Sequence, residues 1–211
     1  LRIPFLCLDG FEADDVMGTL AQRHGDELDV VLVSSDKDLM QLIGDHVTML
    51  DTMKERIFTV QDVRDKFGCD PPLVPDALGI WGDSSDNIPG VKGIGEKGVK
   101  RLMAAFAGLE DIYDRLEEVP TPALKKKLEA DRDSAFLSRH LATIRTDAPV
   151  SQTLEELELH FPPPPEQARD LFNQLDFRTI LRELGGAMEA VDRSGYRLVT
   201  SEAELEVLRS E

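Results

Sequence analysis

The chain has 211 residues, of which 41% are hydrophobic and 31% charged, a composition typical of a globular protein of one or two domains. It has no run of 18 or more apolar residues and no basic, apolar leader, so neither a membrane span nor secretion is expected. The two cysteines, Cys7 and Cys69, form no disulfide framework and no metal-ligand spacing, which favours a reduced, cytoplasmic setting.

The formal net charge of −17 disfavours binding to nucleic acid, but the charge is unevenly distributed. Residues 92–145 hold 11 lysines and arginines against 9 aspartates and glutamates, whereas the segments on both sides are strongly acidic. Solvated charged faces explain such a pattern equally well. Charge alone therefore leaves a nucleic-acid surface in the middle segment as an open hypothesis.

Three short apolar runs near the start predict buried strands: "PFLCL" (4–8), "DVVLVSS" (29–35) and "HVTML" (46–50). Between the first two, "EADDVMGTLAQRHG" has apolar residues at helical spacing. The order strand, helix, strand predicts a parallel, Rossmann-like α/β core. Thr59 is expected to cap a helix that runs through Phe67 and ends at Gly68.

From residue 71 onward the apolar spacing becomes helical, in segments 72–82, 96–107, 109–116 and 121–144. "PPPP" (162–165) predicts a stiff spacer before two short helices, 166–175 and 177–184, and Gly185-Gly186 breaks the pattern. We therefore expect an α/β core over 1–70, a helical subdomain over 71–186, and a linker with the start of a further domain over 187–211.

Acidic residues gather in three clusters: Glu12, Asp14 and Asp15; Asp36 and Asp38; and Asp83 and Asp86. Helix capping or a turn explains any one of them alone. Together, the first two are expected at the carboxyl ends of neighbouring parallel strands, where like charges repel unless cations neutralise them. Oxygen ligands without Cys or His indicate Mg²⁺ or Mn²⁺. The scattered histidines are assigned no role.

Directly after the third cluster, "GVKGIG" (90–95) leads into the predicted helix "EKGVKRLM" (96–103). Glycines let the backbone approach a ligand closely, and a helix N-terminus offers free N–H groups to a phosphate. Lys97, Lys100 and Arg101 add positive charge. An ordinary glycine-rich link is the alternative, but beside a carboxylate pair we interpret the segment as a hairpin that holds a nucleic-acid backbone.

With these residues in view, the chain resembles the 5′→3′ exonuclease domain of bacterial DNA polymerase I, within the flap endonuclease family. "GFEADDVMGTLA", "VSSDKDLMQLI" and "WGDSSDNIPGVKGIGEKG" are similar to three successive family motifs, in order, and the resemblance runs to about residue 186. It implies a PIN-like core with a helix–hairpin–helix element, cleavage of DNA at 5′ flaps or ends in replication and repair, and a cytoplasmic, nucleoid-associated setting.

The resemblance also implies roles for individual residues. Two or more metal ions would be held by Glu12, Asp14, Asp15, Asp36 and Asp38 at the first site and by Asp83 and Asp86 at the second, and all of these except Glu12 would be catalytic. The hairpin would bind DNA through Lys92, Gly93, Gly95, Lys97 and Lys100. A K⁺ ion would bridge it to a phosphate through the carbonyls of Pro89, Val91 and Ile94.

The resemblance begins after the family's first strand and arch, and the tail from Tyr196 is similar to the start of the 3′→5′ exonuclease-like domain that follows in polymerase I. We therefore expect a fragment of a longer polymerase, with impaired cleavage. Two other functions stay open: a DNA-binding fragment without catalysis, and a related metal-dependent ribonuclease with the same core.

Overall fold

The computed structural model describes residues 3–159 and 165–183, which fall into two compact units. One unit runs from Leu6 to Gln152, and the other comprises Leu1–Phe5 and Thr153–Glu211. The predicted Gly185-Gly186 break and the predicted start of a further domain lie outside the described residues, as does most of the "PPPP" spacer. The larger unit carries every candidate site residue.

The larger unit begins with helix α1 (Ala13–His24) and a three-stranded sheet in the order β1 (Val30–Val33), β2 (Val47–Asp51), β3 (Arg56–Phe58). β1 and β2 are parallel and are joined through the short 3₁₀ helix η1 (Asp38–Leu42), whereas β3 returns antiparallel to β2. The α/β core is confirmed, but the sheet is mixed. Strand β3 was not predicted from the sequence, because it follows β2 through a tight hairpin and not through a crossover.

The strand predicted at 4–8 is wrong. This segment is extended but belongs to no sheet, and β1 pairs only with β2 in the described part of the chain. Leu6 and Leu8 instead pack against α1, in a small apolar cluster with Val16, Ala148 and Val150. An apolar run favours burial of side chains, here of Leu6 and Leu8 in part, but only a neighbouring backbone makes the segment a strand.

After the sheet, the larger unit contains six α-helices and two 3₁₀ turns, in the order α2 (Val60–Phe67), η2 (Pro71–Leu73), α3 (Val74–Trp81), α4 (Glu96–Met103), α5 (Leu109–Asp114), η3 (Leu116–Glu118), α6 (Pro122–Ala130) and α7 (Arg132–Ala142). Thr59 and Gly68 cap α2 as predicted, Gly68 with φ of 79°. The long helical stretch is two helices, because Asp131 leaves helical geometry between α6 and α7.

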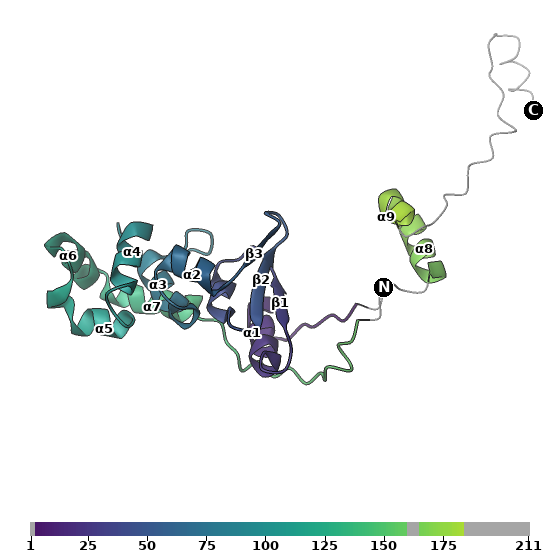
Figure 1. Ribbon diagram of the computed structural model, residues 1–211, viewed down its shortest axis with the longest axis horizontal. Helices are drawn as coiled ribbons and strands as arrows, with labels where there is room; N and C mark the ends of the chain where they lie inside the picture. The colour runs from purple at the N-terminus through teal and green to yellow at the C-terminus, as the bar shows by residue number, and fades with distance from the viewer. Residues whose placement is uncertain (1–2, 160–164, 184–211) are drawn as a thin grey trace, which may run out of the picture. The chain divides into compact units, whose positions relative to one another are not determined.

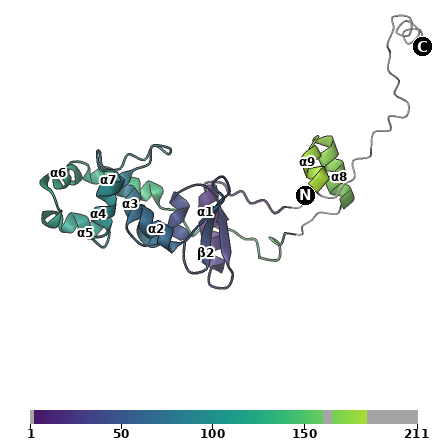
Figure 2. The ribbon, with the colours of Figure 1, turned by 45° about the horizontal axis from the view of Figure 1, so that its top comes forward.

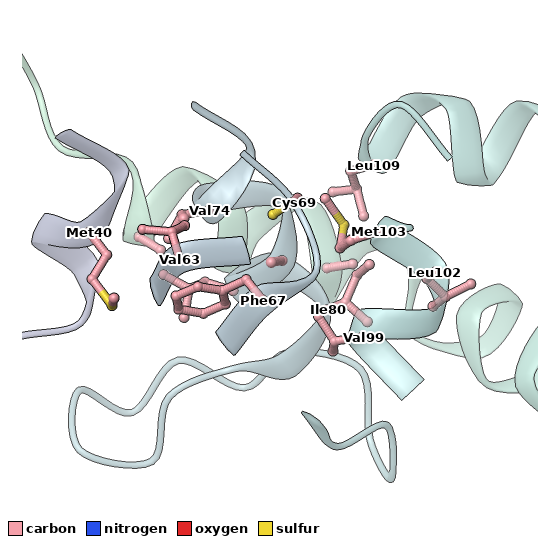
Figure 3. Packing of buried hydrophobic residues seen from close by; sticks show 14 of the residues in the cluster. Met40, Val63, Phe67, Cys69, Val74, Ile80, Val99, Leu102, Met103 and Leu109 are labelled. Carbon is pink, nitrogen blue, oxygen red and sulfur yellow. The ribbon is translucent and has the colours of Figure 1, made fainter. Parts of the chain in front are cut away.

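One hydrophobic core joins the sheet to these helices. In Figure 1 and in the turned view of Figure 2, α2 lies between the sheet and helices α3–α7. Phe67 of α2, fully buried, packs among Met40, Val63 and Val74 on one side, and the core continues to Leu109 on the other (Figure 3). This shared core fixes the strand ends relative to the segment between α3 and α4.

The smaller unit contains α8 (Pro165–Gln174) and α9 (Arg178–Glu183), close to the two predicted helices. Its described core is limited to Ala168, Phe172 and Leu181. Among the described residues, no helix has both the length and the apolar character needed to cross a membrane.

Candidate metal centre and hairpin

The first acidic cluster lies at the N-terminus of α1. Glu12 and Asp15 form a capping box, in which the backbone N–H of each donates to the side chain of the other, at 3.2 Å for Glu12 N to Asp15 Oδ2. Asp15 Oδ1 also accepts the backbone N–H of Arg145 at 2.9 Å. These two carboxylates stabilise the helix start. Burial, followed by the charge of Asp36, raises the pKa of Asp14 between them.

The second cluster follows β1 in a turn that its own side chains hold. The backbone N–H of Asp36 donates to Ser34 Oγ at 3.1 Å, and that of Asp38 donates to Asp36 Oδ1 at 2.9 Å. Asp38 starts η1 and is only 9% exposed. Its Oδ1 is buried and has no hydrogen-bond partner among the described residues. A buried carboxylate oxygen without a partner is costly, and a bound cation would remove that cost.

The third cluster lies in the loop between α3 and α4. Asp83 and Ile88 exchange two backbone hydrogen bonds of 2.8 and 2.7 Å, which close the loop that carries Asp86. Gly82 and Gly90 lie against each other at its base, where a Cβ on Gly90 (φ 61°) would come within 2.7 Å of the Gly82 Cα. Asp83 is 5% exposed, and its Oδ1 accepts the N–H of Ser85 at 2.8 Å.

The second and third clusters converge. Asp38, Asp83 and Asp86 each offer a carboxylate oxygen, and these three atoms lie within 4.8 Å of one another. Burial, reinforced by Asp36, raises the pKa of Asp38 to about 7. Asp14 and Asp36 border this group, since the charges of Asp36 and Asp86 contribute to the raised pKa of Asp14. The structure thus brings carboxylates from α1, from the end of β1 and from the α3–α4 loop to one place.

Lys37 lies within this group and was missed in the sequence, although it stands between Asp36 and Asp38. Its ammonium forms an ion pair with Asp83. Burial opposes ionisation of Asp83, but the hydrogen bond from Lys37 and that from Ser85 outweigh it and lower the pKa of Asp83. A hydrogen bond with Asp83, some loss of solvation and the charge of Asp83 raise the pKa of Asp86, although its side chain is exposed. Lys37 therefore supplies positive charge where the carboxylates are closest.

This donor set fits a hard divalent cation. The three close oxygens are carboxylate oxygens, and the unpartnered Asp38 Oδ1 is among the groups that such an ion satisfies. A cavity of about 290 Å³ adjoins the site, lined by Glu12, Asp14, Asp15, Asp38 and residues 140–145. His140, which was assigned no role in the sequence, is part of its lining.

The glycine hairpin, residues 89–95, follows directly and enters α4. Lys92, Gly93, Gly95 and Lys97 are exposed, as a DNA contact requires. Lys100 instead pairs with Glu96 at 2.6 Å, one turn earlier on α4. Of the three predicted potassium ligands, the Val91 carbonyl already accepts the Ile94 N–H at 3.1 Å. The ligand and DNA-binding roles predicted from the sequence stay predictions.

Comparison with known proteins identifies the family. Residues 1–68 match the 5′-3′ exonuclease, N-terminal resolvase-like domain, and residues 69–165 match the 5′-3′ exonuclease, C-terminal SAM fold. The chain belongs to the 5′-3′ exonuclease family. The predicted resemblance and the combination of an α/β core with a helical subdomain are confirmed.

Curated relatives of this exonuclease family member include DNA polymerase I of Caldicellulosiruptor bescii, which is 40% identical over 87% of the chain and 22% of the relative. The 5′-3′ exonuclease of Buchnera aphidicola subsp. Baizongia pistaciae is 37% identical over 84% of the chain and 61% of the relative. The chain thus spans about a fifth of the length of its DNA polymerase I relatives.

Solved structures agree with this assignment. The T5 D15 protein co-crystallised with metal ions superimposes with a TM-score of 0.60 at 28% identity, covering 66% of this chain and 53% of that one. The T5 flap endonuclease in a pseudo-enzyme-product complex with DNA and metal ions superimposes with a TM-score of 0.57 at 26% identity, covering 65% of this chain and 51% of that one.

Proposed function

We propose that this chain contributes to a divalent-metal-dependent 5′ nuclease that hydrolyses DNA phosphodiesters at 5′ flaps or ends. The convergence of Asp38, Asp83 and Asp86 carries the proposal, since these three residues each offer a carboxylate oxygen within 4.8 Å of the others, and Asp38 also has a buried oxygen without a partner. A DNA-bound and metal-bound T5 flap endonuclease of similar fold supports DNA as the substrate. The polymerase I relatives support a place beside polymerase domains.

Asp38, Asp83 and Asp86 would hold a Mg²⁺ or Mn²⁺ ion, with Asp14 and Asp36 at its border. Glu12 and Asp15 would act through α1, whose N-terminus they cap. When bound, such ions lower the pKa of water and offset the charge that develops on the phosphate oxygens. Lys37, paired with Asp83, becomes available to a phosphate once a cation takes over that carboxylate.

The glycine hairpin would hold the duplex part of the substrate through backbone N–H groups and through Lys92 and Lys97. A K⁺ ion on the hairpin carbonyls would add to this contact. Because the same hydrophobic core supports both the hairpin and the carboxylates, a bound phosphate backbone is held at a set position relative to the metal ligands.

The test is cleavage of an end-labelled 5′-flap DNA by this chain with Mg²⁺, with Asp83→Asn as the variant. We expect cuts near the flap junction that depend on Mg²⁺. The cleavage rate of Asp83→Asn should be lower by about a hundredfold or more. DNA binding, measured with Ca²⁺ in place of Mg²⁺, should be retained by the variant.

Asp45→Asn is the matched control, because Asp45 is exposed and precedes β2, at the end of the parallel strands opposite to Asp36 and Asp38. It should cut like the unmodified chain. Binding of flap DNA without cleavage would instead indicate the non-catalytic DNA-binding alternative. Preferential cleavage of RNA would indicate the ribonuclease.

A further inference from the structure

Four polar residues of α6, α7 and the turn between them form hydrogen bonds with the glycine hairpin. Lys127 lies on α6, Asp131 lies between the two helices, and Ser134 and Ser138 lie four residues apart on α7, and their hydrogen bonds place all four against the hairpin. We call these four residues the polar stripe. It lies more than thirty residues from the hairpin in the sequence, so only the folded structure shows that the two are in contact.

Each member of the polar stripe bonds to the hairpin backbone. Ser138 Oγ accepts the Gly90 N–H at 2.9 Å, and Ser134 Oγ donates to the Gly90 carbonyl at 2.7 Å. Asp131 Oδ2 accepts the Lys92 N–H at 2.8 Å, and Lys127 Nζ donates to the Gly93 carbonyl at 2.7 Å. Ser138 is fully buried, where an unmade hydrogen bond is costly. The stripe therefore defines the conformation of the loop.

These bonds use the hairpin groups that face the helices and leave others open. The N–H groups of Gly93, Gly95, Glu96 and Lys97 have no acceptor among the described residues. They lie together at the start of α4, where the helix dipole favours an anion.

Lys127 adds a charge at the same place. Its ammonium has three donors, of which the Gly93 carbonyl takes one, and its side chain is exposed. No carboxylate pairs with it in the described part of the chain, whereas Lys100 pairs with Glu96 and Lys125 with Glu117. Lys127 is thus a cation held beside free N–H groups, with donors left for an anion.

We propose that Lys127 is a phosphate-contacting residue of the hairpin and that Asp131, Ser134 and Ser138 are the positioning residues that hold the loop for this contact. The inference rests on the proposed function, since the phosphate is that of the DNA backbone. It adds a contact from α6, outside the hairpin motif, to those predicted from the sequence.

The test compares Lys127→Met with Lys126→Met in the complete chain. Lys126 is the next residue on α6, is also exposed, and bonds to no hairpin group, so both variants lose the same charge. Binding to a 5′-flap DNA is followed by fluorescence anisotropy in Ca²⁺ across a series of KCl concentrations. Lys127→Met should bind about 5–10-fold more weakly at 0.1 M salt, and the slope of log K against log salt should become less steep by about 0.9.

Lys126→Met should keep the slope of the unmodified chain. Equal slopes for Lys127→Met and the unmodified chain, or an equal loss in both variants, would overturn the phosphate contact while leaving the proposed function intact. Absence of any binding of flap DNA by the unmodified chain would overturn both.

Two variants of Asp131 distinguish its role in positioning the loop from the effect of its negative charge on DNA binding. Asp131→Asn keeps an oxygen acceptor for the Lys92 N–H and removes a negative charge, so it should bind DNA as tightly as the unmodified chain or more tightly. Asp131→Ala removes the same charge and also the acceptor, and should bind severalfold more weakly. If both variants bind more tightly, Asp131 acts only through its charge and the positioning role is wrong.

Discussion

At the scale of single residues, the site is defined by side chains whose burial and charge conflict. Asp38 is nearly buried, carries an oxygen without a partner, and lies beside Asp36, Asp83 and Asp86. Such a group is unfavourable in the ionised state unless a cation is present. Lys37 offsets part of the negative charge by pairing with Asp83 and lowers the pKa of that carboxyl.

The raised pKa of Asp38, about 7 against an ordinary 3.8, predicts a pH dependence of stability in the metal-free chain. The folded state binds more protons than the unfolded state between these values, so the free energy of unfolding falls as pH rises from about 4 to 7. Asp38→Asn removes the ionisation, and we expect it to raise the melting temperature at pH 8 by roughly 3–6 °C and to change it little at pH 4. Thermal unfolding in EDTA measures both.

The control for this prediction is Asp45→Asn, since Asp45 is exposed and lies outside the acidic group. Its melting temperature should follow the unmodified chain at both pH values. An equal gain for Asp38→Asn at pH 4 and pH 8 would mean that ionisation of Asp38 does not destabilise the folded chain.

At the scale of elements, α2 links the sheet to the helical part. Thr59 starts it with a capping box to Asp62, and Gly68 ends it in the left-handed region. Directly after the helix, Gly68 lies against the backbone of Lys100 on α4. The end of α2 is therefore also the packing contact that sets the position of α4 and of the hairpin before it.

Gly68→Ala should destabilise the chain by more than about 2 kcal/mol, because the new Cβ would lie 2.8 Å from the Lys100 carbonyl oxygen in a backbone conformation that alanine avoids. Gly44→Ala is the comparison, since a Cβ there meets no atom within 4 Å and Gly44 is not among the glycines with positive φ. It should change stability by less than about 0.5 kcal/mol. Urea unfolding measures both, and equal effects would contradict the packing role of Gly68.

At the scale of the whole molecule, the larger unit has its own core and carries the whole candidate site. Its last residues pack on α1 in the small second cluster: Ala148 and Val150 contact Val16, the Ala148 N–H donates to Thr19 Oγ1 at 3.0 Å, and Arg23 donates to the Val150 carbonyl at 3.0 Å. Because the net charge is −17, the proposed contacts with DNA should be local and sensitive to salt.

A chain trimmed to residues 6–152 should therefore unfold cooperatively, within about 2 °C of the complete chain. A chain trimmed to residues 6–145 lacks Ala148 and Val150 and should unfold at least about 4 °C lower, because Val16 loses its cover. Circular dichroism on heating tests both. A trimmed 6–152 chain without a cooperative transition would show that the remaining residues are needed for folding.

The sequence by itself determined the helix boundaries that depend on local chemistry, such as Thr59 and Gly68 around α2, and the three acidic motifs that indicate the family. It also determined the α/β class, because apolar periodicity is a local property of the chain. Only the tertiary structure decided that residues 4–8 form no strand, that Asp38 meets Asp83 and Asp86, and that Lys127 reaches Gly93. These outcomes depend on which distant segments pack together, and a local pattern does not encode that choice.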